Sequence, residues 1–296
     1  MLASSRPPAF RLLHLSDPHF GAERPEVVEA LLRLAAAQSP DLCVVSGDLT
    51  QRARPAQFRR AAAFFERLRS VTDDAPQLLV PGNHDVPLIN LWARWRSPYQ
   101  LYCDSFAAPP EGRFESDDVV VFGVNTSTPR RRVDGEVTVT QREAIAAALT
   151  ALDDARLKVV VVHQPVAVPA HSQRQRLLHG GREAALAWGR AGADLVLGGH
   201  IHLPYALPLQ ASLEGLPRPL WLVHAGTAVS DRLRMGAPNS VNELLFETAT
   251  RRLRLRRWDF SETRSAFLRR SDRFLALAGA YPGEWTNRLT SAPQTS

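Results

Sequence analysis

The amino-acid sequence predicts an α/β fold in which a largely parallel sheet is covered by helices on both faces. Near-continuous apolar segments alternate with amphipathic ones along most of the chain. Such uniformly apolar strands are typical of sheets that are buried on both sides. A chain of 296 residues that is 45% hydrophobic can bury a large core, as one α/β domain or as two small ones.

The first part of the chain alternates strands with helices. Strands are predicted at residues 10–16, 41–46 and 77–81, and helices at 25–38 and 55–70. In the first helix Pro25 stands in the first turn, where its missing N–H is not needed, and Val28, Leu31 and Leu32 recur at helical spacing.

The second part continues this alternation and then changes. Strands are predicted at 119–125, 157–163 and 193–197, and helices at 140–152 and 181–191. After residue 219, the segments "LWLVHAG", "VNELLFET" and "RLRLRRW" are expected to form successive antiparallel strands. We expect a single domain over 1–296, with an inserted helical cap at 86–118 and an Arg-rich C-terminal extension at 251–296.

Five of the predicted strands end in side chains that can bind metal. The motifs are "DPH", "GDLT", "GNHD", "HQP" and "GGHIH". Because the carboxyl ends of parallel strands gather along one edge, these side chains should lie together. They are Asp17, His19, Asp48, Asn83, His163, His200 and His202. The two histidines of the last motif stand at i and i+2, so both rings can reach one centre or two adjacent ones.

The donor types narrow the choice of metal. Carboxylate, imidazole and amide oxygen without thiolate suit divalent Mn, Fe, Zn, Mg or Co. The seven candidates are too many for one tetrahedral ion, and they suit two ions about 3.5–4 Å apart that share a carboxylate. Such a pair can hold a hydroxide at neutral pH and clamp a phosphate oxygen. Two divalent metal ions are therefore the expected cofactors.

In their order, the five motifs resemble those of the calcineurin-like metallophosphoesterase superfamily, over about residues 10–230. The similarity is greatest to the bacterial class III cyclic-nucleotide phosphodiesterase-like group. The resemblance implies a four-layer αββα sandwich with two mixed sheets. It places Asp17, His19, Asp48 and His202 on one metal, and Asp48, Asn83, His163 and His200 on the other, with Asp48 bridging. It also gives His84 a catalytic role, beside the leaving oxygen or on the phosphate.

The predicted function is dinuclear-metal-dependent hydrolysis of small phosphodiesters, with a cAMP-like cyclic nucleotide favoured. A broad-specificity phosphoesterase and a nucleotide-lipid pyrophosphatase are alternatives, and a nuclease or an inactive metal scaffold is less favoured. The sequence has no Walker or dinucleotide glycine pattern and no G-x-S-x-G motif, which argues against nucleotide-driven motors and serine hydrolases.

The positive charge is concentrated near the C-terminus. Residues 251–274 carry nine Arg against three acidic residues, and this excess of +6 equals that of the whole chain. The remainder is neutral, so no stable nucleic-acid partner is expected. In "RRLRLRRW" the apolar strand face should pack on the second sheet. The cationic face suits a homodimer interface or peripheral contact with an anionic membrane.

The roles of several other residues remain open at this stage. Contact with substrate is possible for His224, Arg130, Arg131, Arg132, Trp92, Trp95 and Tyr99. Asp85 either caps a turn or orients His84, His14 is expected in the core or behind the ligands, and His179 is expected to be solvated. Without a membrane-length apolar stretch, a secretory signal or a disulfide framework, the sequence favours a cytoplasmic location.

Overall fold

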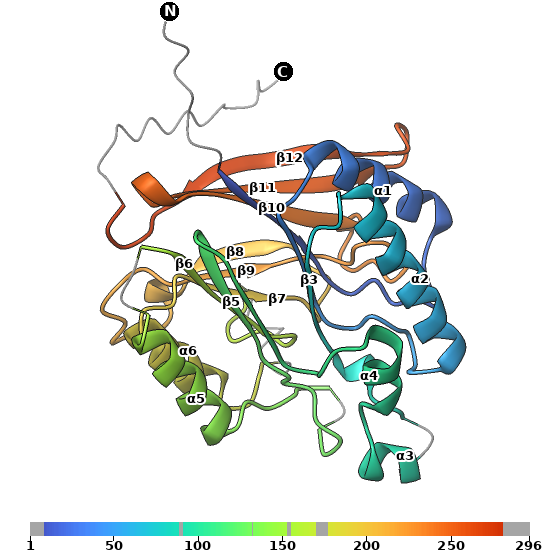
Figure 1. The fold of residues 1–296 in the computed structure, drawn as a ribbon, viewed down its shortest axis with the longest axis horizontal. Helices are drawn as coiled ribbons and strands as arrows, with labels where there is room; N and C mark the ends of the chain where they lie inside the picture. The colour runs from blue at the N-terminus through green and yellow to red at the C-terminus, as the bar shows by residue number, and fades with distance from the viewer. Residues whose placement is uncertain (1–8, 89–90, 132, 153–154, 170–176, 281–296) are drawn as a thin grey trace, which may run out of the picture.

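Two sheets packed face to face form the centre of the molecule, and helices cover the outer face of each (Figure 1). The computed structural model describes residues 9–88, 91–131, 133–152, 155–169 and 177–280. Each sheet has six strands, and each mixes parallel with antiparallel pairing. The four-layer αββα sandwich with two mixed sheets is therefore confirmed.

The first sheet has the strand order β12-β11-β10-β1-β2-β3. Its strands are β1 (Phe10–Leu15), β2 (Leu42–Ser46), β3 (Gln77–Val80), β10 (Ser240–Glu247), β11 (Arg252–Ser261) and β12 (Ala266–Leu275). Pairing is parallel from β1 to β3, and β10 joins β1 antiparallel, with His14 opposite Asn242. The polar residues that follow β1, β2 and β3 consequently emerge on one edge of this sheet.

The second sheet has the order β4-β5-β6-β7-β9-β8. Its strands are β4 (Gly112–Glu115), β5 (Val119–Gly123), β6 (Leu157–Val161), β7 (Leu195–Gly198), β8 (Tyr205–Pro208) and β9 (Trp221–His224). Its four central strands are parallel, and β4 and β8 pair antiparallel at the two edges. The four parallel strands are almost entirely buried, as their apolar sequences predict.

The helices form the two outer layers (Figure 1). Beside the first sheet lie α1 (Pro25–Gln38), α2 (Pro55–Val71) and α4 (Gln100–Phe106), and beside the second lie α5 (Val139–Thr150) and α6 (Gly181–Arg190). The remaining helical elements are α3 (Leu91–Arg96) and the 3₁₀ turns η1 (Asn83–Asp85), η3 (Leu209–Ala211) and η4 (Thr248–Thr250). No helix in the described part of the chain is long and apolar enough to cross a membrane.

Three apolar clusters hold the layers together. Between the sheets, Leu12 and Val44 pack in one cluster with Val159. Phe58 belongs to the cluster under α1 and α2, and Trp188 to the cluster under α5 and α6. Trp188 is completely buried, and its indole N–H donates to the Arg142 carbonyl at 3.2 Å. The packing of these clusters fixes the two sheets against each other, so the ends of their strands keep fixed relative positions.

Two expectations about strand placement are wrong. The segment "LWLVHAG" contains β9, which lies parallel to β7 instead of starting an antiparallel series. The residues of β9 are buried because the strand is paired on both edges, with β7 on one side and with β8 on the other. Residues 86–118 are not wholly a helical cap, since they contain β4 as well as α3 and α4. The Phe114 ring of β4 lies 6.2 Å from that of Phe10, so this segment joins the sandwich.

The Arg-rich segment is built into the first sheet as β11 and β12. Leu253 and Leu255 point into the cluster between the sheets, which confirms that the apolar face packs on the second sheet. On the other face, the Arg254 guanidinium pairs with the Asp272 carboxylate through two hydrogen bonds, and Arg256 contacts both Asp272 and Glu243. Much of the cationic face is therefore neutralised within the chain. Residues 281–296 of the expected extension lie outside the described residues.

Candidate metal centre

The loops that follow β1, β2 and β3 meet the loops that follow β6 and β7. The His200 main-chain N–H donates to Asp17 Oδ2 at 2.8 Å, which ties the "GGHIH" loop to the "DPH" loop. His163 Nδ1 donates to the Ser46 carbonyl at 2.7 Å, which ties β6 to β2. All seven predicted metal ligands are buried where these loops meet, although they come from both sheets.

A first group of side chains surrounds His19. It consists of Asp17, His19, Asp48 and His202, whose donor atoms all lie within 4.8 Å of one another. His202 Nε2 is 3.2 Å from Asp17 Oδ1, and His19 Nε2 is 3.6 Å from Asp48 Oδ2. This is the ligand set that the resemblance gives to one metal.

A second group shares Asp48 with the first. Asp48, His163 and His200 place their donor atoms within 4.8 Å of one another. His163 Nε2 lies 3.3 Å from Asp48 Oδ1, 3.3 Å from Asn83 Oδ1 and 3.3 Å from His200 Nδ1. The two Asp48 oxygens therefore face different groups, which is the arrangement that a bridging carboxylate requires.

The hydrogen bonds of the rings show that these donor atoms fit cations. His202 Nδ1 donates to the Arg232 carbonyl at 2.6 Å, and His163 Nδ1 donates to the Ser46 carbonyl. In the neutral form of each ring, the Nε2 atom therefore carries a lone pair toward the centre, as is usual for metal-binding histidines. His19 Nε2 lies only 3.0 Å from His202 Nε2, and the buried Asp17 Oδ1 has no hydrogen-bond partner among the described residues. A divalent cation would satisfy these converging lone pairs.

The backbone of five predicted ligands is strained. Asp17, His19, Asp48, His200 and His202 have φ angles of 50°, 46°, 53°, 72° and 57°. Left-handed conformations of residues other than glycine cost roughly 1–3 kcal/mol each and cluster at functional sites. All five residues stand within four residues of the end of β1, β2 or β7, where the predicted ligands gather.

Two glycines allow the loops to approach closely. A Cβ atom on Gly199 would lie 1.8 Å from Ser16 Oγ and 2.4 Å from Asp17 Oδ2. A Cβ atom on Gly82 would lie 2.1 Å from Asp48 Oδ1. Glycine is therefore required at both positions, because any larger residue would clash with the neighbouring carboxylate, that of Asp17 or that of Asp48.

Burial and neighbouring charges set the protonation of the centre. Burial lowers the pKa of His19 to about 4 and that of His200 well below its ordinary value, so both rings are neutral. Burial would raise the pKa of the Asp17 carboxyl, but His202 and His19 outweigh it and hold that pKa low. Burial would likewise lower the pKa of His163, but the Asp48 carboxylate raises it to about 9. A bound cation would compete with this His163 proton, because metal ligation requires the neutral ring.

His84 lies beside the first group and outside both donor sets. Its main-chain N–H donates to Asp48 Oδ1 at 2.8 Å, and its ring Nδ1 donates to the Gln51 carbonyl at 2.7 Å. The ring meets that of His19 edge-on, with the centroids 4.9 Å apart. The other ring nitrogen of His84, Nε2, lies 3.4 Å from Arg232 Nη1.

Comparison with known proteins gives the family. Residues 10–204 match the family described as calcineurin-like phosphoesterase. The chain belongs to this family. It is accordingly a metal-dependent hydrolase of phosphoric esters, and its two donor groups have the residue types and spacing that could hold metal ions.

Similar proteins support this membership. The phosphoesterase is 25% identical, over 207 residues, to a protein of Pseudoalteromonas sp. (strain SM9913) named probable cyclic nucleotide phosphodiesterase PSM_A2567. That alignment covers 66% of this chain and 72% of the relative.

Two solved structures share the fold at 12% sequence identity. The purple acid phosphatase PPD1 from yellow lupin (Lupinus luteus) seeds matches with a TM-score of 0.65, covering 93% of this chain and 57% of the lupin chain. A dimetal phosphatase from Danio rerio (LOC 393393) matches with a TM-score of 0.62, covering 92% of this chain and 100% of the other. The phosphoesterase therefore spans little more than half of the lupin chain.

Asp85 stabilises the loops that carry the ligands. Its carboxylate accepts hydrogen bonds from the main-chain N–H groups of Leu49, Thr50 and Gly82, at 2.9, 2.7 and 2.8 Å. Burial, followed by the Asp48 charge, raises the pKa of Asp85 to about 6, while these donors oppose the shift. Of the two roles that the sequence left open, capping the turn is the one that the contacts support.

The other residues with open roles lie at different depths. His14 is fully buried with Nε2 2.9 Å from Ser46 Oγ, and His224 is fully buried with Nδ1 donating to the Gly199 carbonyl at 2.9 Å. Both therefore lie behind the predicted ligands, where they support the loops.

The remaining candidates lie nearer the surface. Arg130 is exposed, Arg131 pairs with Glu136 at 3.3 Å, and the Tyr99 hydroxyl donates to the Ser127 carbonyl. Trp92 and Trp95 of α3 are 73% and 61% exposed. His179 is half exposed, 3.7 Å from Asp134, as expected for a solvated side chain. Arg132 lies outside the described residues.

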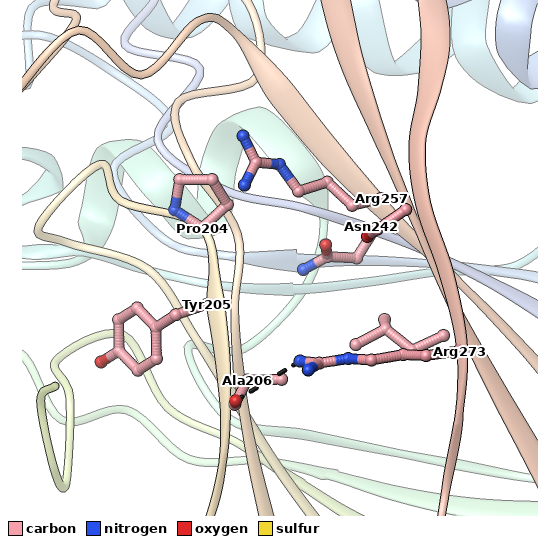
Figure 2. Close-up of a pocket in the computed structure, with 8 residues that line it drawn as sticks. Pro204, Tyr205, Ala206, Asn242, Arg257 and Arg273 are labelled. Carbon is pink, nitrogen blue, oxygen red and sulfur yellow. Dashed lines mark hydrogen bonds between the residues drawn. The ribbon is translucent and has the colours of Figure 1, made fainter. Parts of the chain in front are cut away.

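A cavity of about 220 Å³ lies away from the metal centre, where β8 faces β11 and β12 (Figure 2). Arg273 reaches across it toward β8, and its guanidinium is 3.4 Å from the Ala206 carbonyl. Asn242 lines its inner end and donates to the His224 carbonyl at 3.1 Å. Because none of the predicted ligands lines this cavity, we do not assign it to the reaction.

Sequence reasoning missed Arg232 and Gln51, which both contact His84. Arg232 lies in the segment "SDRLRMG", between β9 and β10, and Gln51 follows the "GDLT" motif. Neither residue lies in a motif with ligand spacing, so only the folded loops reveal their positions.

Proposed function

We propose that this phosphoesterase hydrolyses small phosphodiesters, with a cyclic nucleotide as the leading substrate, using two divalent metal ions. The observation that carries the proposal is the pair of donor groups that share Asp48. Asp17, His19, Asp48 and His202 would hold one ion, and Asp48, Asn83, His163 and His200 the other. When bound, such a pair supplies activated water and charge stabilisation for the phosphate oxygens.

The protein groups around the centre have separate tasks in this proposal. Asp48 keeps both donor groups in one geometry, because its two oxygens face different histidines. His84 is fixed through its Nδ1 hydrogen bond to the Gln51 carbonyl, so its imidazolium form, which also has a proton on Nε2, can give that proton to the departing alkoxide or stabilise its charge. Asp85 keeps the loops in place and does not take part in proton transfer.

Three observations support the choice of a small diester. The Pseudoalteromonas relative is named a probable cyclic nucleotide phosphodiesterase. The exposed indoles of Trp92 and Trp95 offer apolar surface on which one base can stack. The cationic segment 251–274 carries many of its arginines in ion pairs with Asp272, Glu243 and Asp259, so it is not a track for a long polyanion.

A substrate panel tests this proposal. Metal-loaded protein should cleave a chromogenic diester faster than the matching monoester, and it should cleave cyclic AMP or cyclic 2′,3′-AMP. A monoester turned over more than about tenfold faster would overturn the diester assignment, since tenfold corresponds to 1.4 kcal/mol in transition-state stabilisation. Diester activity without cleavage of any cyclic nucleotide would overturn the cyclic-nucleotide assignment.

We also propose a homodimer formed along the edge strand β12. Its exposed Leu268 and Phe274 lie on a long strand with one edge that no other described strand pairs, which favours pairing with a second copy. Sedimentation velocity should give a mass that rises to twice that of the chain as concentration increases, and Leu268→Glu should shift it back toward the monomer. A monomer at all concentrations contradicts this, and salt-sensitive vesicle binding would instead indicate the peripheral membrane contact.

A further inference from the structure

Arg232 belongs to a loop that is fixed to the metal-binding loops. This loop, residues 225–239, connects β9 to β10. The Thr227 hydroxyl donates to the Asp17 carbonyl at 2.6 Å, and the Ala228 N–H donates to the Ser16 carbonyl at 2.9 Å. The Asp231 N–H donates to the Ala22 carbonyl at 2.9 Å. The backbone of Arg232 is therefore held in a defined position beside the centre.

Arg232 contacts the centre through both its backbone and its side chain. Its carbonyl accepts the hydrogen bond from His202 Nδ1, which aims the other ring nitrogen at Asp17. Its guanidinium Nη1 donates to Gln51 Oε1 at 2.9 Å and lies 3.4 Å from His84 Nε2. The positive charge thus lies next to the proposed catalytic histidine.

This guanidinium has no carboxylate partner among the described residues. Arg24, Arg251, Arg254 and Arg256 all make ion pairs. The contacts of Arg232 use Nη1 alone, so within the described chain its Nε and Nη2 donors have no partner. A half-buried cation beside two predicted divalent ions is electrostatically unfavourable unless an anion lies between them.

We propose that Arg232 binds a non-bridging phosphoryl oxygen of the substrate through these remaining N–H groups. The planar guanidinium has the donor geometry that phosphate oxygens accept, often in pairs. This inference rests on the proposed function, and it adds a substrate-binding residue that is outside the metal ligand set. Gln51 holds the guanidinium from one side, and the phosphate completes its environment.

Equilibrium binding of inorganic phosphate to metal-loaded protein tests the proposal without relying on turnover. Arg232→Met should weaken phosphate binding, measured by calorimetry, by about 10- to 100-fold, the range expected for lost hydrogen bonds to a charged group. Metal content should not change, because the carbonyl that orients His202 is main-chain. Arg232→Lys should recover part of the affinity, since it restores the charge but not the planar donors.

Steady-state kinetics with a chromogenic diester give a second measurement. KM should rise more than kcat falls in Arg232→Met, whereas a residue that only positions His84 would lower kcat and leave phosphate affinity intact. Arg67→Ala is the control, because this arginine is exposed on α2 and, within the described chain, its ion pair is with the exposed Glu29. Unchanged phosphate affinity in Arg232→Met, or a wild-type protein that binds no phosphate, would overturn the inference. A wild-type protein that binds phosphate but cleaves no diester would instead refute the proposed function.

Discussion

Asp48→Asn is expected to reduce both metal content and turnover more than any other single substitution. Each Asp48 oxygen faces a different histidine, with Oδ1 3.3 Å from His163 Nε2 and Oδ2 3.6 Å from His19 Nε2. The amide removes a negative charge that both donor groups share. In the native protein the His84 main-chain N–H donates to Asp48 Oδ1. In the variant this N–H would face either the amide N–H₂ group or an uncharged oxygen.

Removing a residue that only hydrogen-bonds to a metal ligand typically lowers activity by roughly 10–100-fold. The loss of turnover in Asp48→Asn should be larger. Elemental analysis of purified protein and initial rates with a chromogenic diester measure the two effects. Asp104→Asn is the matched control, because this carboxylate is exposed on α4, accepts a hydrogen bond from Gln100 and belongs to neither donor group. Two ions per chain and near-normal rates in Asp48→Asn would show that Asp48 does not bridge.

His84→Ala should lower kcat by roughly 10²–10⁴-fold while the metal content stays normal. The ring lies beside the first donor group and outside both donor sets, so its loss removes a proton-transferring or charge-stabilising group and no ligand. The hydrogen bond from the main-chain N–H to Asp48 survives the substitution. Single-turnover rates and elemental analysis separate the chemical step from metal loss.

His179→Ala provides the matched control for His84, since this histidine is half exposed near Asp134. Its variant should retain wild-type kcat. If His84→Ala lost metal, His84 would be a ligand, and if it kept wild-type kcat, His84 would have no part in the reaction.

The position of the centre could be predicted from sequence because strand ends gather at one edge of a parallel sheet. Asp17 and His19, and likewise His200 and His202, stand two residues apart after apolar strands, and the structure brings all four together. The left-handed φ angles of these residues could not be predicted, because local preference disfavours them and only the surrounding packing enforces them.

Long-range contacts explain what sequence reasoning missed. Arg232 is separated from His84 by 148 residues, half of the chain's length, and no local pattern marks their 3.4 Å approach. Likewise, the sequence of β9 is that of an ordinary apolar strand and does not indicate its neighbours. In the structure β9 lies between β7, to which it is parallel, and β8, to which it is antiparallel. By contrast, the alternation of Arg and Leu in β11 predicts which side chains face the core, because successive residues of a strand point to opposite faces of the sheet.

Titration of metal-free protein with Mn²⁺ tests the central claim most directly. Activity against a chromogenic diester should be absent without metal, rise with added Mn²⁺ and reach its plateau at two ions per chain, with elemental analysis giving the same ratio. A plateau at one ion per chain, or diester cleavage that persists after metal removal, would contradict a dinuclear centre built around Asp48.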